Sequence, residues 1–299
     1  MRIFVTGGTG LIGRKLLPRL VEANHEVFLL SRHEGPVSES WTTITGDPAV
    51  ADESWLKRVD ECDAVIHLAG EPVFAHRWSK KFKQKLWDSR VLSTQILANR
   101  LREKRRSNRI FLSGSAIGYY GSRGDEELTE KSAPGTDFLA QLCQAWEAAA
   151  SEAENAARVV SIRTGIVLDP AGGSLKQMIP PFRFFFGGPL SDGQQWMSWI
   201  HIEDQVEALL FALNNSQIQG PLNLTAPEPI RNWGFSKALG DQLHRPSWFP
   251  VPEFLMRIAL GEVTEVAVGS QRVYPARLSE NGYSFRFTSL KNALANLLG

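Results

Sequence analysis

The sequence predicts an α/β protein, in which a doubly wound parallel sheet is followed by a smaller C-terminal lobe. Short apolar strands alternate with helical patterns over the first two thirds of the chain, as in such sheets. The strands are continuous apolar runs, as expected when both faces of a parallel sheet are covered. After residue 169 the chain becomes rich in glycine, proline and aromatic residues. We therefore predict a sheet domain of residues 1–169 and 201–226, and a lobe of residues 170–200 and 227–299.

The first unit of the sheet is a strand, a helix and a second strand within residues 1–32. Residues 2–6 and 26–31 are apolar, β-branched runs. Apolar side chains at helical spacing lie between them, at Leu16, Leu17, Leu20 and Val21. A glycine-rich turn joins the first strand to the helix, with the sequence Thr6-Gly7-Gly8-Thr9-Gly10-Leu11-Ile12-Gly13.

Three glycines of this turn have the spacing of a dinucleotide site. Gly7 permits a tight turn, Gly10 lets a pyrophosphate approach the backbone, and Gly13 lets the helix pack closely on the strand. Free N–H groups at the helix start favour the anion. The strand before the turn and the helix after it favour dinucleotide binding over an ordinary tight turn. The expected contacts are Gly7, Thr9, Gly10, Leu11, Ile12 and Gly13.

The end of the second strand indicates which dinucleotide binds. NAD sites place an acidic residue there for the ribose 2′-hydroxyl, whereas an arginine accommodates the 2′-phosphate of NADP. This chain has Ser31 and Arg32 and no acidic residue at that point. The alternative is a solvated surface arginine. We predict NADP(H), held at its 2′-phosphate by Ser31 and Arg32.

The remaining elements continue the alternation. Strand candidates are residues 42–45, 64–70, 109–113, 159–163 and 222–225, and helical stretches are residues 80–102, 138–157 and 202–213. Right-handed crossovers would join them into one parallel sheet. Ligands of such sheets bind at the carboxyl ends of the strands, so the lobe is expected to close over that edge.

The composition is that of an ordinary globular protein, with 43% hydrophobic and 22% charged residues. A net charge of +1 gives no general reason to expect nucleic acid or an anionic membrane as partner. The two cysteines fit a reducing cytoplasm, and the six histidines show no metal-ligand spacing. The chain starts directly with a strand and has no apolar run of membrane length, so we expect a cytoplasmic protein acting on a small molecule.

Five motifs in sequence order resemble those of the extended short-chain dehydrogenases/reductases, the group containing the nucleotide-sugar epimerases. They lie at residues 6–13, 67–70, 113–121, 163–168 and 199–204. The resemblance narrows to an atypical branch, the epimerase family proteins, whose reaction is not generally established. Segments 69–71, 77–78, 89–91, 271–275 and 282–285 resemble that branch.

This resemblance implies a Rossmann fold with a nicotinamide coenzyme. Leu68, Ala69 and Gly70 would line the ribose and pyrophosphate, and the backbone around Val167 would pass the nicotinamide. Extended relatives often dimerise through two long helices, which makes a homodimer a candidate assembly.

Two cations on the predicted helix 80–102 belong to the expected coenzyme site. Arg90 is placed near the pyrophosphate, because an arginine buried beside glycines normally requires an anion. Lys85, on the same helix, is expected to assist, with a solvated surface position as the alternative.

Typical members of the group use a Tyr-x-x-x-Lys pair for proton transfer, and this chain lacks it. Its tyrosines are Tyr119, Tyr120, Tyr274 and Tyr283, followed four residues later by Arg123, Gly124, Leu278 and Phe287. On the helix that should carry the pair, the two frames considered are Phe138 with Leu142 and Leu142 with Trp146. Both frames are apolar, so the usual mechanism does not apply.

Four residues are candidates to replace the pair. Ser115 matches the serine that binds a reacting carbonyl or hydroxyl, or else belongs to a strand-end turn. Tyr119 or Tyr120 could donate a proton, or else serve in aromatic packing. Glu71 could act as a general base or sugar ligand, or else form a helix cap or salt bridge. Cys143 is expected to be a buried, inert thiol.

The sequence therefore leaves three functions open. The first is an NADP(H)-dependent oxidoreductase acting on a small carbonyl or hydroxyl compound. The second is a non-catalytic NADP(H) sensor or scaffold. The third is a nucleotide-sugar epimerase with relocated acid–base groups, which would need phosphate-binding arginines in the lobe. Candidates for that role are Arg183, Arg231, Arg272 and Arg277.

Overall fold

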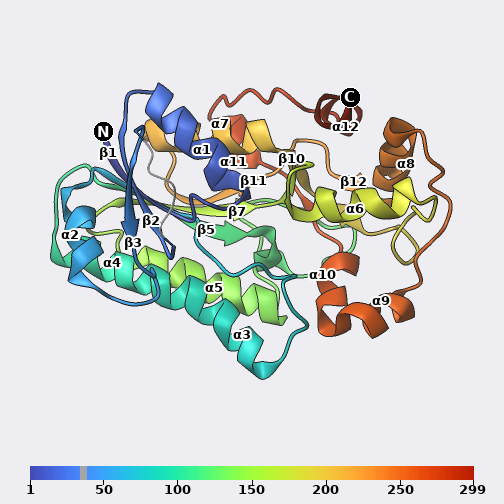
Figure 1. Cartoon of the computed structure of the whole chain (residues 1–299), viewed down its shortest axis with the longest axis horizontal. Coiled ribbons are helices and arrows are strands. Elements are labelled where there is room, and N and C mark those ends of the chain that lie inside the picture. Colours follow the sequence, from blue (N-terminus) through green and yellow to red (C-terminus); the bar gives the residue numbers. More distant parts are fainter. Residues whose placement is uncertain (34–38) are drawn as a thin grey trace.

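In the computed structural model, which describes residues 1–33 and 39–299, a seven-stranded parallel sheet forms the centre of the molecule (Figure 1). The strand order is β11-β7-β5-β4-β1-β2-β3, so the chain builds outward in both directions from β1 and β4. The strands are β1 (Arg2–Thr6), β2 (Glu26–Ser31), β3 (Thr42–Thr45), β4 (Ala64–His67), β5 (Ile110–Ala116), β7 (Arg158–Thr164) and β11 (Gly220–Leu224). The predicted doubly wound fold is confirmed.

Helices cover both faces of the sheet. Figure 1 shows α1 (Leu11–Glu22) and α7 (Ile202–Asn214) on one face, and α2 (Glu53–Glu61), α4 (Ser93–Glu103) and α5 (Phe138–Ser151) on the other. Successive side chains of a strand point to opposite faces. In β1, Ile3 and Val5 join the core beneath α1 and α7, whereas Phe4 joins Trp55 of α2 on the other side. Two cores are thus separated by one sheet.

The long helix predicted for residues 80–102 is divided. It runs as α3 (Lys80–Trp87), a π-helical turn (Asp88–Leu92) and α4. The Ser93 hydroxyl donates to the Ser89 carbonyl at 2.9 Å and lies 3.1 Å from the Arg90 carbonyl, at the wide turn. Such π-turns often occur at functional sites, and this one carries Arg90.

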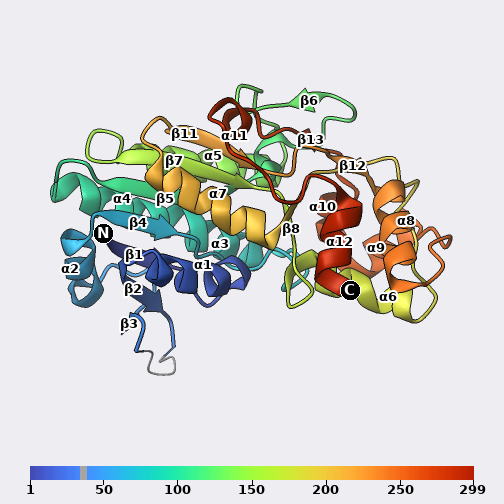
Figure 2. The ribbon, with the colours of Figure 1, turned by 90° about the horizontal axis from the view of Figure 1, so that it is seen from above.

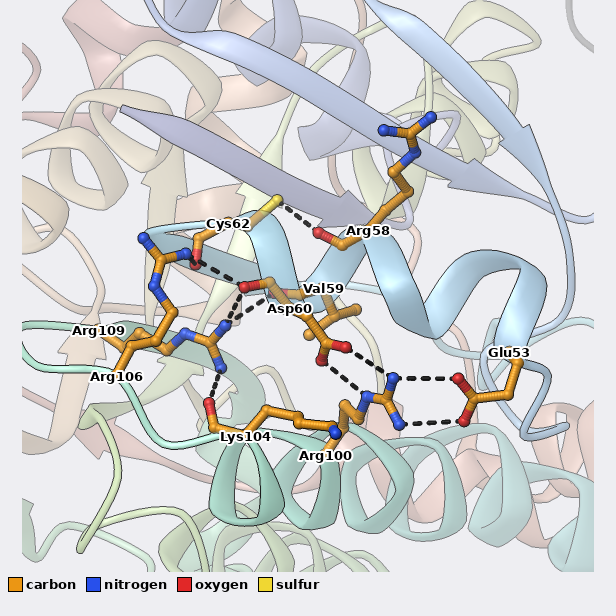
Figure 3. Close-up of polar contacts among 9 residues, drawn as sticks. All are labelled: Glu53, Arg58, Val59, Asp60, Cys62, Arg100, Lys104, Arg106 and Arg109. Carbon is orange, nitrogen blue, oxygen red and sulfur yellow. Dashed lines mark hydrogen bonds and ion pairs between the residues drawn. The ribbon is translucent and has the colours of Figure 1, made fainter.

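The basic tail of α4 fastens α2 to the sheet (Figure 3). Arg100 bonds Glu53 at 3.0 Å and Asp60 at 2.6 Å. Arg109, the residue before β5, donates to the carbonyls of Lys104, Val59 and Asp60, the last two in the final turn of α2. A cation at this position complements the carbonyl end of a helix. These arginines therefore stabilise the fold at the amino ends of the strands, opposite the carboxyl ends where the site is predicted.

The second half of the chain adds a smaller group of helices at one end of the sheet (Figure 2). It contains α6 (Gly173–Arg183), α8 (Asn232–Leu243), α9 (Glu253–Leu260), a 3-10 turn (Gly261–Val263), α10 (Thr264–Val268) and α12 (Leu290–Leu298). The short helix α11 (Ala276–Glu280) instead packs on β11, and its Leu278 belongs to the core beneath α1 and α7. A third apolar core joins α6, α8 and α12 through Leu175, Phe235 and Leu294. The exact division into two domains stays a prediction.

Short strand pairs connect this group to the sheet domain. β8 (Ile166–Leu168) pairs with β10 (Trp199–His201), β9 (Trp196–Met197) with β12 (Ile230–Arg231), and β6 (Glu127–Leu128) with β13 (Arg272–Val273). A 3-10 turn (Ile117–Tyr120) follows β5. Among the helices of the described residues, none combines the length and apolarity needed to cross a membrane.

Candidate coenzyme site

The glycine-rich turn is interlocked with the end of β4. Gly7 has φ +73°, and a Cβ there would lie 2.5 Å from the Leu68 carbonyl carbon and 2.6 Å from the Ala69 nitrogen. A Cβ on Gly13 would overlap the Gly7 oxygen and the Gly8 Cα, so α1 can approach the turn only with glycine there. The structure thus brings together the predicted residues of β1, α1 and β4.

The N-terminus of α1 is open to an anion. Gly10 is its N-cap residue, and no described side chain accepts a hydrogen bond from the first turn as a cap. Thr9 and Gly10 are exposed, and Leu11 and Ile12 are half-buried. The amide groups and the helix dipole therefore form the anion site that a pyrophosphate requires. The glycine cradle and this uncapped helix fit a dinucleotide.

A buried polar chain supports the turn from below. The Thr6 hydroxyl lies 2.6 Å from Nδ1 of His67, and Nε2 of His67 lies 2.9 Å from the Ser93 hydroxyl. The Ala69 amide donates to the Thr6 hydroxyl at 3.3 Å. Burial lowers the pKa of the His67 imidazole to about 3, so the ring is neutral. These hydrogen bonds connect the glycine-rich turn to Ser93, the first residue after the π-helical turn that carries Arg90.

At the adenosine end, Glu71 lies between two cations. Its carboxylate oxygens are 3.0 Å from the Lys85 ammonium and 3.9 Å from the Arg32 guanidinium. The Glu71 side chain is only 10% exposed, whereas those of Arg32 and Lys85 are 58% and 55% exposed. The structure therefore places Glu71 beside the predicted 2′-phosphate site and pairs it with both cations that would bind the phosphate.

Arg90 is a half-buried cation with neutral partners. Its guanidinium donates to the carbonyls of Glu71 at 2.9 Å and Leu86 at 3.3 Å, and stacks 5.4 Å from the centre of the Trp146 ring. A Cβ on Gly70 would lie 3.3 Å from its central carbon. Burial lowers the pKa of Arg90 below its ordinary value. A charge so placed is stabilised by an anion at the strand ends.

The nicotinamide end is framed by the start of α6. A Cβ on Gly173 would lie 3.0 Å from Leu11 and 3.6 Å from the Val167 carbonyl oxygen. Leu11 of α1 and Val167 of β8, predicted as coenzyme contacts, are therefore neighbours across this glycine. They come from positions far apart in the chain, and the fold brings them together on either side of Gly173.

The serine predicted to orient a substrate is part of a charged network. The Ser115 hydroxyl donates to Glu147 at 2.6 Å, and Arg163 binds both oxygens of that carboxylate at 2.8 Å. The Arg163 side chain is 3% exposed and that of Glu147 is 14% exposed. Glu147 and Arg163 were not among the predicted site residues. An arginine at the end of an apolar strand was the signal that could have identified them.

The two neighbouring tyrosines differ. Tyr120 is fully buried, and its hydroxyl donates to Asn223 at 2.7 Å and accepts from Arg163 at 2.9 Å. Burial raises the pKa of this phenol to about 12. Tyr119 is half-buried, with the Arg163 guanidinium 3.5 Å from its ring centre. Of the two predicted proton donors, Tyr119 is therefore the better placed to meet a ligand.

Toward β5 and the turn after it, α5 presents Leu139, Cys143 and Trp146, and of these only Trp146 belongs to the two predicted frames. A Cβ on Gly118 would lie 3.5 Å from Leu139 and 3.8 Å from the Cys143 sulfur. Leu139 and Cys143, four residues apart, thus face the strand end, whereas Leu142 packs with Phe82 and Leu86. Burial raises the pKa of the Cys143 thiol to about 12. The residues at this spacing, Leu139 and Cys143, are therefore not a tyrosine–lysine pair either.

Three of the four candidate phosphate-binding arginines of the lobe have protein partners. Arg231 pairs with Asp125 at 2.9 Å and Arg272 with Glu127 at 3.0 Å, and both stack on Trp196, while Arg277 donates to the Pro221 carbonyl at 2.8 Å. These contacts give each of the three a role in the fold.

The fold and the site define a dinucleotide-binding Rossmann protein without the usual catalytic pair. The model of the NAD dependent epimerase/dehydratase family matches residues 3–224, and that of a domain of unknown function, DUF1731, matches residues 251–297. The chain belongs to the NAD dependent epimerase/dehydratase family. The resemblance predicted from the motifs is thereby confirmed.

Similar proteins span the whole chain. The chain is 38% identical to the epimerase family protein SDR39U1 homolog, chloroplastic, of Arabidopsis thaliana, covering 100% of this chain and 87% of that protein. It is 35% identical to the epimerase family protein YfhF of Bacillus subtilis, covering 100% and 98%. The crystal structure of human epimerase family protein SDR39U1 with NADPH superposes with TM-score 0.88 at 32% identity, covering 100% and 99%.

Proposed function

We propose that this protein binds NADP(H) and is an atypical oxidoreductase for a small carbonyl or hydroxyl compound. The observation that carries the coenzyme assignment is the pair of exposed cations, Arg32 and Lys85, around one buried carboxylate at the end of β2 and β4. A phosphate offers these cations more charge than a ribose hydroxyl does. The similar human protein crystallised with NADPH supports the same assignment.

The glycine turn and the α1 N-terminus would hold the pyrophosphate, with Arg90 as its side-chain cation. Ser31, Arg32 and Lys85 would hold the 2′-phosphate, and Leu68, Ala69, Gly70 and Val167 would line the remainder. Bound NADPH supplies a hydride donor at the strand ends. Glu71 then belongs to the coenzyme site, because its carboxylate is paired at the adenosine end.

At the other end, Ser115 would hold the oxygen of the substrate. The Ser115 hydroxyl donates its hydrogen bond to the Glu147 carboxylate. The lone pairs of the Ser115 oxygen can therefore accept a hydrogen bond from a substrate hydroxyl. Tyr119 would manage the proton, since the Tyr120 hydroxyl is enclosed by Arg163 and Asn223. Mutation of Tyr119 to phenylalanine, under single-turnover conditions with a substrate found by screening, tests this role.

The non-catalytic sensor is the second candidate. The observation that favours it is the closed network of Ser115, Glu147 and Arg163, in which the polar groups are already satisfied. It predicts tight NADPH binding with no oxidation of NADPH by any carbonyl compound. An epimerase with relocated groups is less well supported, because Arg231, Arg272 and Arg277 have protein partners.

Isothermal titration with NADPH and NADH tests the coenzyme assignment. We expect Arg32→Gln to weaken NADPH binding about tenfold, equivalent to about 1.4 kcal/mol, and to leave NADH binding unchanged. Arg2→Gln is the matched control, since Arg2 is a half-exposed arginine paired with Glu26 at the opposite edge of the sheet. Equal binding of NADPH and NADH by the unmodified chain would contradict the assignment.

We also propose a cytoplasmic location and a homodimer. The two buried free cysteines support the location, since they fit a reducing compartment. Sedimentation analysis tests the dimer, for which a single species at the monomer mass of 33.3 kDa is the contradicting result.

A further inference from the structure

Three short segments of the C-terminal lobe expose an unusual concentration of apolar side chains. They are residues 184–186 after α6, residues 248–249, and the outer face of α9 with Phe254, Leu255 and Ile258. More than half of the large hydrophobic side chains exposed in the described part of the chain come from these segments, which we call the aromatic patch. Phe184, Trp248 and Ile258 are 72%, 71% and 69% exposed. Patches of this kind mark interaction sites.

The first two segments are held against each other, and the chain enters α9 directly after the second. The Val251 amide donates to the Pro189 carbonyl at 2.8 Å, and the Ser191 amide donates to the Val251 carbonyl at 2.9 Å. The rings of Phe186 and Phe249 lie 6.4 Å apart. Phe185 is held at φ +66°, a strained conformation for an aromatic residue, which the fold maintains although burial of its ring does not require it.

Helix α9 is oriented by contacts with the sheet domain. Arg77 donates to the Ile258 carbonyl at 2.5 Å, and Lys83 of α3 pairs with Glu262 at 2.5 Å. Of its eight residues, only Met256 is buried. A surface helix normally presents polar residues to solvent, and here Phe254, Leu255 and Ile258 are exposed instead. The apolar side therefore faces away from the protein.

The charges of the patch are positive. Residues 183–190 and 244–260 contain three arginines and one acidic residue, Glu253, which is paired with Arg257 at 2.8 Å. Arg183 is exposed, and Arg245 stacks 4.8 Å above the Phe185 ring and donates to the His244 carbonyl. Among the residues that the structure describes, neither Arg183 nor Arg245 has a carboxylate partner, and the two guanidinium groups adjoin the exposed aromatic segment.

We propose that the aromatic patch docks this protein onto an anionic lipid surface. Phenylalanine, tryptophan and leucine with flanking arginines are the composition of interfacial membrane-binding segments, in which apolar tips enter the acyl boundary and guanidinium groups bind phosphate. A protein interface carries about one hydrogen bond per 100–200 Å². The exposed side chains of this patch itself offer one donor, the indole of Trp248, and the further donors are the guanidinium groups at its border, which suit phosphate. The net charge of the chain, +1, did not indicate such a partner, because the arginines act locally.

Vesicle co-sedimentation of the full chain tests the proposal. We expect binding to vesicles of phosphatidylglycerol and phosphatidylcholine, with much weaker binding to phosphatidylcholine alone and a decline as salt is raised. The triple variant Phe184→Ser, Phe186→Ser, Trp248→Ser should bind roughly a hundredfold more weakly. Arg183→Glu with Arg245→Glu should lose the preference for anionic vesicles.

Trp233→Ser is the matched control, because Trp233 is an exposed tryptophan outside the patch and its loss should leave vesicle binding unchanged. Unaltered thermal stabilisation by NADPH shows that each variant is folded. The proposal is overturned if the unmodified chain does not bind anionic vesicles, or if the triple variant binds equally well. It is also overturned if the patch instead mediates self-association that the triple variant abolishes, without vesicle binding.

Discussion

Two carboxylates of the candidate coenzyme site, Glu71 and Glu147, have opposite environments. Glu71, at the adenosine end, is bound by Lys85 and Arg32, whose side chains are more than half exposed. Glu147, at the nicotinamide end, is bound by Arg163, which is almost fully buried, and by Ser115. In the first arrangement the two cations can exchange Glu71 for a ligand anion at little cost to themselves, because water solvates them, although the carboxylate of Glu71 is itself buried. The second cannot be opened without leaving a charge buried.

This difference separates binding from chemistry in the molecule. The exposed cations beside Glu71 are the proposed phosphate ligands, whereas the polar groups around Glu147 mainly satisfy one another. Under the proposed function, a substrate would bond to Ser115 without displacing Glu147 and would find its proton donor in Tyr119.

The largest change in stability is expected from a substitution of Glu147, the carboxylate paired with the buried Arg163. Glu147→Gln leaves the Arg163 guanidinium buried without a counter-charge, so the free energy of unfolding should fall by about 3–5 kcal/mol. Urea denaturation measures it. If the free energy of unfolding decreases by less than about 1 kcal/mol, then Arg163 is solvated once its partner is removed.

The buried hydrogen-bonded chain of Thr6, His67 and Ser93 should make stability depend on pH. His67 is neutral in the folded protein, with its pKa lowered to about 3, whereas the unfolded chain binds a proton near pH 6.5. The unfolded state therefore binds more protons between these values, and stability falls as the pH falls through this window. From pH 7 to pH 5 His67 should contribute a loss of about 2 kcal/mol. Urea titrations at both pH values, compared with His67→Gln, measure it; an equal pH dependence in the variant contradicts the assignment.

The interlocked turn gives the next effect. Gly13→Ala forces the new Cβ against the Gly7 oxygen and the Gly8 backbone, which should cost about 1–3 kcal/mol and displace the coenzyme cradle. Gly118→Ala is the control, because its Cβ would meet its nearest neighbour at an ordinary 3.5 Å. Thermal unfolding with and without NADPH measures both. Equal effects of the two substitutions would show that the close approach at Gly13 is not required.

The smallest change in stability is expected from Glu71→Gln, the counterpart of Glu147→Gln. The free energy of unfolding should change by less than about 1 kcal/mol, since both cations remain hydrated. NADPH should bind roughly threefold to tenfold more tightly, because Lys85 and Arg32 no longer have a competing carboxylate. Isothermal titration measures this, and weaker binding would show that Glu71 positions the two cations.

Much of the sheet could be predicted, because strand and helix signals are local. The run Val27-Phe28-Leu29-Leu30 is buried on both faces, and it forms an inner parallel strand between β1 and β3. The helix at residues 80–102 was predicted as continuous, since the π-turn depends on hydrogen bonds of Ser93 that a periodic pattern does not show. The helix predicted for residues 138–157 ends at Ser151, where short turns replace its last residues.

The site was predictable only in part. Gly7, Gly13 and Arg32 follow from a motif whose residues adjoin in sequence. Glu147 and Arg163 were missed because their partner, Ser115, is 32 residues from one and on a different strand from the other. The face that α5 presents to β5 could not be chosen from the sequence, since either face of an apolar helix fits the pattern.

The sequence alone determined the order of strands and helices, the glycine cradle and the loss of the tyrosine–lysine pair, because each depends on residues close together in the chain. Tertiary structure decided which charges meet. Glu71 was equally consistent with a base, a cap or an ion pair until the ends of β2 and β4 brought Arg32 to within 3.9 Å of it. Coulomb interactions and burial depend on distances across the fold, and those distances are set by packing.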